Sequence, residues 1–208
     1  RSTRPSTRAR CSWPTPASCV NVQLQVPFGS PGTGGTQTMP RAWPSITAEA
    51  AKNRIPPDNI HVASVLTAAD GGEDAHITWE NGPERTSYLP SRNCILQVKA
   101  AAITPGKAAK DVLTAAGDLE PVIRETLEAG GNYIMLCNRA YVRREVVKRA
   151  TAVLEAIHAQ GVAAKASQIA FRDADQIATW VNEHPQVATW VQEQTQPSLA
   201  TTFRTYMH

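Results

Sequence analysis

Short apolar runs alternate with helical patterns through the second half of the chain, and this alternation limits the fold more than any other feature. In the helical segments apolar residues recur every three to four positions, whereas the strand-like runs are brief. Alternating helices and strands favour an α/β fold. The predicted elements are helices at Leu119–Ala129, Val142–Gln160 and Ala174–Glu183, a further turn or two after Pro185 through Trp190, and strands at Tyr133–Cys137 and Ile169–Phe171.

The preceding part of the chain is richer in strand patterns. One short helix is expected at Thr47–Arg54, because Ser45 and Thr47 offer N-cap chemistry and two prolines follow at 56 and 57. Strands that first cluster and then alternate with helices predict a mixed central sheet flanked by helices. The strands expected here are Ile60–Leu66, His76–Trp79 and Cys94–Ala100, with a turn at Asp70-Gly71-Gly72 and a polar loop at Glu80–Asn93.

The first acidic residue of the chain is Glu49, so the segment before it contains no Asp or Glu. We expect residues 1–42 to be a disordered basic tail rich in Gly and Pro. The folded domain is expected at 43–196, with its core between Ile46 and Val191. Residues 197–208 are expected to begin a linker to a further C-terminal region. Whether the residues before Met39 belong to the native protein stays open.

Composition excludes several classes of protein. Hydrophobic residues make up 42% of the 208 residues, which fits a soluble globular domain with a hydrophobic core. The net charge of +3 is compatible with nucleic-acid binding. No apolar run approaches the roughly 20 residues of a membrane span, and no signal peptide is visible. The cysteines form no CxxC pair, which argues against zinc. We expect a cytoplasmic protein with reduced thiols at Cys94 and Cys137 and no membrane partner.

Two polar side chains interrupt the predicted strand at 94–100. Side chains alternate between the faces of a strand, so Gln97 and Lys99 point to one side, while the other face is wholly apolar. An amide and an ammonium group within an apolar strand are costly to bury unless both are satisfied. The strand therefore predicts a functional site at Gln97 and Lys99.

An acid lies shortly upstream of this strand. Asp74 follows Gly71 and Gly72, which let the chain bend sharply before the preceding strand, so Asp74 and the Gln-x-Lys pair can converge on one point. Carboxylate and amide oxygens are hard ligands suited to Mg²⁺, and a lysine can stabilise charge that builds on a phosphate. Asp70 competes for the metal role, but Asp74 is preferred because it adjoins the strand.

Asp74 with Gln97-Val98-Lys99 resembles the D…(E/Q)xK signature of the PD-(D/E)xK nucleases, and the Gln form after Gly-Gly-x-Asp is similar to the Mrr-like restriction endonuclease branch. The resemblance implies a restriction-endonuclease-like core and a DNA endonuclease of restriction or antiphage defence. By this resemblance Asp74, Gln97 and Val98 (through its backbone carbonyl) hold Mg²⁺ or Mn²⁺, and Lys99 orients the attacking water. Two departures are the long interval from Asp74 to Gln97 and the helix acid, for which Glu49 is a weak match.

Basic residues after the Gln-x-Lys strand would contact DNA phosphates. Lys107 and Lys110 follow the strand, and Arg143, Arg144 and Lys148 lie in the first two turns of the long helix. The competing interpretation is that these bases of the helix form an ordinary solvated face without a ligand. The apolar face of that helix is expected to carry Val146, Val147, Ala150, Val153, Leu154 and Ile157.

Two other functions stay open. A catalytically inactive domain that binds or senses nucleic acid is one, because the neutral Gln97 lowers the negative charge of the site and its metal affinity. An interaction module flanking an NTPase is the other, and in it the motif would be incidental. The sequence does not show whether the domain is fused to or associated with an NTPase, whether it forms a homo-oligomer, or which DNA sequence it recognises.

Overall fold

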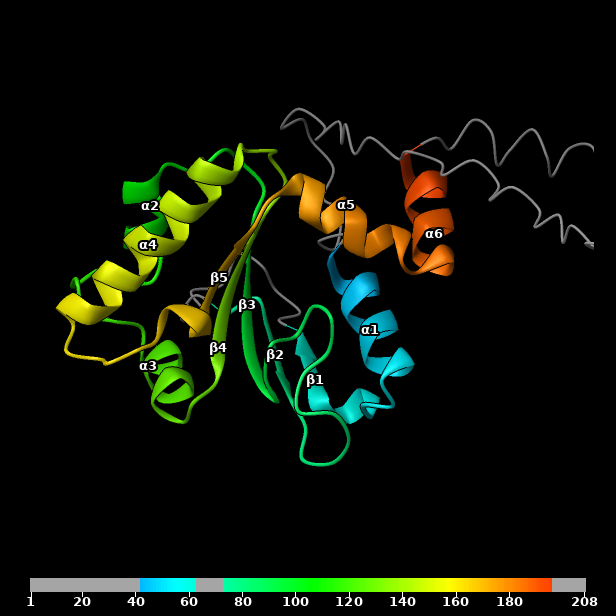
Figure 1. The fold of residues 1–208 in the computed structure, drawn as a ribbon, viewed down its shortest axis with the longest axis horizontal. Helices are drawn as coiled ribbons and strands as arrows, with labels where there is room; N and C mark the ends of the chain where they lie inside the picture. Colours follow the sequence, from blue (N-terminus) through cyan, green and yellow to red (C-terminus); the bar gives the residue numbers. More distant parts are fainter. Residues whose placement is uncertain (1–41, 63–72, 196–208) are drawn as a thin grey trace, which may run out of the picture.

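The computed structural model describes residues 42–62 and 73–195, and five strands form one sheet between two layers of helices (Figure 1). Their order across the sheet is their order along the chain. β1, β2 and β3 pair antiparallel, whereas β3, β4 and β5 pair parallel, so the predicted mixed α/β sheet is confirmed. The strands are β1 (Ile60–Val62), β2 (Ala75–Thr78), β3 (Asn93–Lys99), β4 (Asn132–Cys137) and β5 (Ile169–Arg172).

The helices lie in two layers, one on each face of the sheet (Figure 1). Parallel strands need crossover connections, and the first layer supplies them: α2 and α3 join β3 to β4, and α4 joins β4 to β5. This layer contains α2 (Pro105–Lys110), α3 (Pro121–Glu128) and α4 (Arg143–Ala159), and the second contains α1 (Ala42–Lys52), α5 (Ala174–Asn182) and α6 (Pro185–Thr195); two short 3₁₀ turns lie at Pro57–Asn59 and Ala166–Gln168.

All six residues of the central strand β4 are buried, because both faces of the sheet are covered. Tyr133 and Met135 belong to the core under α2, α3 and α4, and Ile134 and Leu136 belong to the core under α1 and α5. The two faces of β4 therefore separate two hydrophobic cores, and a side chain's parity along the strand decides which core it joins.

Local capping chemistry places several helix ends where the sequence predicts them. The Asp173 carboxylate accepts a hydrogen bond from the Gln176 N–H at 3.1 Å and begins α5. Gly130 (φ 81°) and Gly161 (φ 79°) follow α3 and α4 in the left-handed conformation that glycine adopts most easily. α2 was not expected: Thr104 caps it at the Lys107 N–H, but six residues are too few to show helical periodicity.

Two sequence-based expectations need correction. α1 begins at Ala42, so Ser45 and Thr47 lie within the helix instead of capping it. Val147, expected on the buried face of α4, is 55% exposed, and Arg149 is buried in its place because its guanidinium stacks on the Tyr141 ring at 3.8 Å. Of the strand predicted at 60–66, the structure describes Ile60–Val62 as β1, and residues 63–66 lie outside the described residues.

Several expectations lie outside the described residues, namely the Asp70-Gly71-Gly72 turn, most of the tail and the linker after residue 196. The thiols of Cys94 and Cys137 are buried and unpaired, as expected. Within 42–62 and 73–195 no helix is both long and apolar enough to cross a membrane.

Candidate active site

The carboxyl-terminal end of β3 brings the predicted site residues together. Ala75 of β2 pairs with Leu96 of β3, and continuing that antiparallel register by one residue places Asp74 beside Gln97. The Asp74 N–H donates to the Leu96 carbonyl oxygen at 3.0 Å, and the Val98 N–H donates to Asp74 Oδ2 at 2.5 Å. The carboxylate of Asp74 is thereby fixed against the backbone of β3.

The backbone of Val98 faces the same place. In a strand the N–H and C=O of one residue point to the same neighbouring strand. The Lys99 carbonyl accepts from the Asn138 N–H at 3.2 Å on the β4 side, so the Val98 carbonyl points to the opposite side, toward Asp74. The Asp74 carboxylate and the Val98 carbonyl are therefore on the same side of β3, and Val98 is next to Gln97 in the strand.

Gln97 is held by a residue that the sequence did not suggest. Its side chain is only 6% exposed, and its Oε1 accepts a hydrogen bond from the Tyr133 hydroxyl at 2.5 Å. Complete burial raises the pKa of Tyr133 well above its usual value, and the negative charges of Asp111 and Asp74 raise it further. The phenol therefore stays protonated and donates. One lone pair of the Gln97 oxygen is engaged, which leaves the other to a cation or a water.

Lys99 also has a partner that the sequence did not suggest. Its Nζ lies 3.0 Å from Oδ2 of Asp111, the residue that ends α2, and the two side chains are 24% and 20% exposed. That carboxylate oxygen is buried, and the described residues offer it no hydrogen bond of good geometry. Compensation for burying Oδ2 therefore comes from the charge of Lys99.

The site as a whole combines a lysine, an amide, a phenol and two carboxylates. The negative charges of Asp111 and Asp74 both raise the pKa of the Tyr133 hydroxyl, which donates to Gln97. Within 42–62 and 73–195 no three His, Cys, Asp or Glu residues are grouped closely enough to hold a metal. Asp74, Gln97 and Val98 lie at neighbouring positions of two paired strands, and their oxygen donors are of the type that Mg²⁺ and Mn²⁺ accept together with waters and phosphate.

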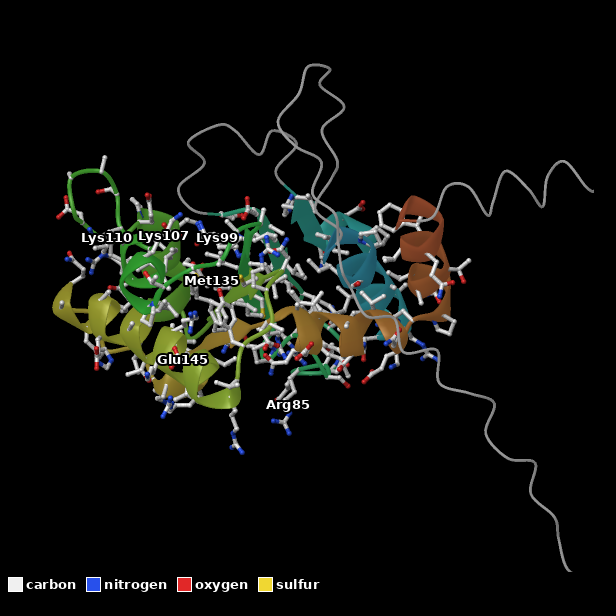
Figure 2. The ribbon with its side chains drawn as sticks, turned by 90° about the horizontal axis from the view of Figure 1, so that it is seen from above. Arg85, Lys99, Lys107, Lys110, Met135 and Glu145 are labelled. Atoms are coloured by element: carbon white, nitrogen blue, oxygen red, sulfur yellow. The ribbon has the colours of Figure 1, made fainter. Side chains whose placement is uncertain are left out.

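The five basic residues expected to contact DNA are all exposed. Figure 2 looks down on the sheet and shows Lys99, Lys107 and Lys110 in a row, with Glu145 on the neighbouring helix. Arg143, Arg144 and Lys148 lie on α4, which packs against α2.

Glu145 offsets part of the positive charge at the start of α4. Its Oε1 accepts from Lys148 Nζ at 2.7 Å and lies 3.9 Å from the Nε of Arg144. The hydrogen bond from Lys148 lowers the pKa of the Glu145 carboxyl below its usual value. Arg144 and Lys148 therefore present less net charge to a ligand than their number suggests.

Two residues considered in the sequence take structural positions elsewhere. Glu49, the weak match for a helix acid, lies in the α1 layer, where its buried Oε2 is 3.1 Å from Nε2 of the buried His184. It is on the far side of the sheet from Gln97, whose partner Tyr133 belongs to the other core. His76 points its Nε2 at Oδ1 of Asn93, 2.7 Å away, and holds β2 to β3.

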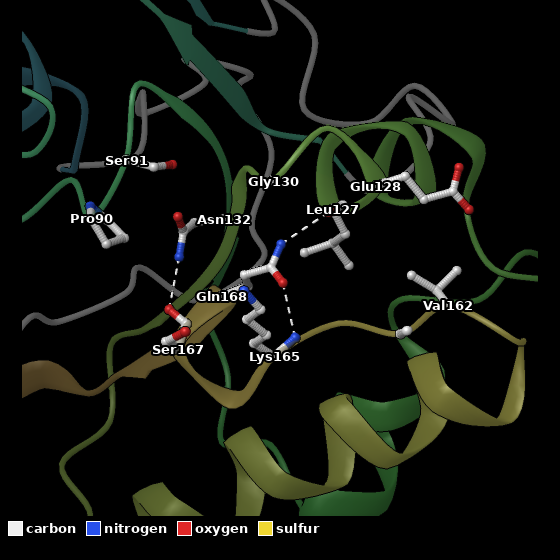
Figure 3. A pocket seen from close by; sticks show the side chains of 11 residues that line it. Pro90, Ser91, Leu127, Glu128, Gly130, Asn132, Val162, Lys165, Ser167 and Gln168 are labelled. Atoms are coloured by element: carbon white, nitrogen blue, oxygen red, sulfur yellow. Dashed lines mark hydrogen bonds between the residues drawn. The ribbon is translucent and has the colours of Figure 1, made fainter.

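A pocket of about 630 Å³ lies at the opposite end of the sheet, where β4 and β5 begin (Figure 3). Its polar side chains bind the protein itself: Asn132 donates to the Ser167 carbonyl at 2.9 Å, and Gln168 donates to the carbonyls of Leu127 and Gly131. None of the predicted site residues lines this pocket.

Tyr133 and Asp111 are the site residues that sequence reasoning missed. The alternation of side chains along β4 gave a signal for Tyr133: Tyr133 and Met135 share one face of the strand, and Ile134 and Leu136 occupy the other. Asp111 carried none, because its position depends on α2.

Comparison with known proteins gives no relative. No family model matches the chain, and no curated protein and no solved structure matches it.

Proposed function

We propose that this chain contains a metal-dependent DNA endonuclease domain with a PD-(D/E)xK core of the Mrr-like kind, belonging to a restriction or antiphage defence protein. One observation carries the proposal: Asp74 Oδ2 accepts from the Val98 N–H at 2.5 Å, on the sheet face that also bears Gln97 and Lys99. This contact between residues more than twenty positions apart supports the proposal.

Each residue has a role in this proposal. Asp74, the Val98 carbonyl and the free lone pair of Gln97 would hold Mg²⁺ or Mn²⁺, which supplies a Lewis acid for the phosphate and its attacking water. Lys99 orients that water and stabilises the negative charge that develops on the phosphate. The proposed reaction is an in-line hydrolysis without a covalent intermediate, in which water is the nucleophile.

DNA is the proposed substrate because exposed lysines and arginines surround this edge of the sheet. Lys107 and Lys110 extend the row that begins at Lys99 (Figure 2), and Arg143 and Arg144 are exposed at the start of α4. Such residues bind the phosphate backbone without reading sequence. A cytoplasmic location, an NTPase module and self-association remain further parts of the proposal, and the buried free thiols of Cys94 and Cys137 fit the first of these.

A second candidate is a domain of the same fold that binds nucleic acid without cleaving it. Two observations favour it: the Gln97 oxygen is already engaged by Tyr133, and the Lys99 ammonium is paired with Asp111. A neutral amide in place of a carboxylate also weakens metal binding. Calorimetric titration with Mg²⁺ and Mn²⁺, combined with DNA cleavage assays, separates the two candidates.

Lys99→Met is the decisive substitution, with Lys165→Met as its matched control, because Lys165 is exposed at the opposite end of the sheet. Losing one such electrostatic group costs about 2–4 kcal/mol of transition-state stabilisation, or roughly a hundredfold or more in rate. Lys99→Met should therefore slow cleavage by about that factor and reduce DNA binding only modestly, whereas Lys165→Met should cleave normally. Equal cleavage rates for Lys99→Met and the wild type would show that the site assignment is wrong.

Folding of Lys99→Met needs its own control, because the substitution leaves the half-buried Asp111 without its cation. The double variant Lys99→Met with Asp111→Asn removes that unpaired charge. If cleavage is lost in both variants while the double variant unfolds at the wild-type temperature, the loss belongs to the chemistry.

A further inference from the structure

We infer that Asp111 is a further residue of this site, and that its carboxylate positions the ammonium group of Lys99 for the reaction. The inference rests on the proposed function. Asp111 lies outside the Asp…Gln-x-Lys pattern, and it reaches the site only because α2 folds back over the end of β3. It is a positioning residue, since it acts through Lys99.

The place of Asp111 is locally unfavourable. It ends α2, and an acidic side chain at the carboxyl end of a helix meets the negative end of the helix dipole. Its Oδ2 is also buried. The contact that compensates both penalties is the Lys99 ammonium at 3.0 Å. Local rules are broken most often where a site requires it.

The backbone that carries Asp111 is firmly held. Thr104 caps the start of α2 through the Lys107 N–H, and Ala108 and Val112 are fully buried in the core beneath α4. The Asp111 N–H in turn donates to the Lys107 carbonyl at 3.0 Å. The carboxylate is thus presented by packed structure, whereas a surface loop would leave it mobile.

Lys99 gains most from such a partner. A lysine side chain has a flexible four-carbon stem. A catalytic group that samples many conformations accelerates the reaction less than one held in the reactive geometry. Asp111 fixes the far end of the stem, and β3 fixes the near end. It also neutralises the charge of Lys99 locally.

The test is a double-mutant cycle read in two ways. Asp111→Asn keeps the shape of the side chain and removes its charge, and Asp118→Asn removes the same charge from an exposed position of the following loop. We expect kcat for DNA cleavage to fall about ten- to hundredfold in Asp111→Asn with KM little changed, as for partners that orient a catalytic group. Asp118→Asn should cleave like the wild type, and Asp111→Glu should recover part of the rate.

Background dependence distinguishes positioning from a general structural role. In the Lys99→Met background, Asp111→Asn should lower the residual rate no further, because the group that it positions is absent. Urea unfolding of the same four proteins should show coupling between the two positions. Unchanged kcat in Asp111→Asn, or an equal loss in both backgrounds, would overturn the inference.

Failure of the proposed function gives a different result. If the wild type does not cleave DNA with Mg²⁺ or Mn²⁺ at all, the nuclease assignment fails, and the catalytic role of Asp111 fails with it. Coupling in the unfolding experiments alone then reduces Asp111 to a structural ion-pair partner.

Discussion

Replacing Tyr133 with Phe removes one oxygen atom from a position that has no solvent exposure. The Oε1 of Gln97 then loses its hydrogen-bond donor, now 2.5 Å away, while the side chain is only 6% exposed. A buried acceptor without a partner costs about 1–3 kcal/mol. We therefore expect the free energy of unfolding to fall by about 2 kcal/mol. For a chain of this size that loss lowers Tm by roughly 4–8 °C.

Urea unfolding followed by circular dichroism measures this loss directly. Gln97→Met completes the cycle, because it removes the acceptor and keeps the length of the side chain. If the phenol and the amide are partners, the double variant should lose less than the two single variants together, by about 1 kcal/mol or more.

Tyr88→Phe is the matched control. The Tyr88 hydroxyl also donates to a side chain, Glu183 Oε1 at 2.6 Å, but the Glu183 side chain is 43% exposed, so water can replace the lost donor. Its ring keeps its stacking on Trp180. We expect the control to lose less than about 1 kcal/mol. Equal stability of Tyr133→Phe and the wild type, or strict additivity in the cycle, would refute the reasoning.

Three further predictions concern packing, DNA binding and charge. Gly131→Ala should destabilise the fold by about 1–3 kcal/mol, because its Cβ would lie 2.7 Å from a backbone oxygen, whereas Gly106→Ala meets open space and should be neutral or stabilising in thermal unfolding. Arg144→Ala with Lys148→Ala should weaken DNA binding and flatten its salt dependence, and an unchanged slope would remove α4 from the interface. In NMR titration, Lys148→Ala should raise the pKa of Glu145, because the hydrogen bond from Lys148 lowers it in the folded wild type. Any contribution of this pair to stability is present above the usual glutamate pKa. It is lost as the pH falls through the lowered pKa of the folded state.

Much of the fold followed from periodicity. The alternation of short apolar runs and amphipathic segments predicted β3, β4, β5, α4 and α5 within a few residues of their ends. The same alternation put Gln97 and Lys99 on one face, and antiparallel pairing of neighbouring strands brought Asp74 to them. These features depend on local residue patterns, which can be identified in the sequence directly.

The remainder depends on contacts between distant segments. Asp111 could not be placed because α2 has only six residues, and the partner of Tyr133 depends on which residue of β3 its strand pairs with. Arg149 belongs to the basic helix α4 and yet is buried. Its Nε donates to the Ile103 carbonyl at 2.8 Å, and only the path of the chain after β3 puts that carbonyl there.

Strands that lie in the sheet in their chain order have a consequence for assembly. Each of the five described strands pairs with its neighbours in sequence, so each pairing closes a single connection. Contacts of short sequence separation favour fast folding. The candidate site is also confined to the interval 74–133, which ends at Tyr133. Its geometry can therefore form from β2, β3, α2 and β4 during synthesis, before α5 and α6 have left the ribosome.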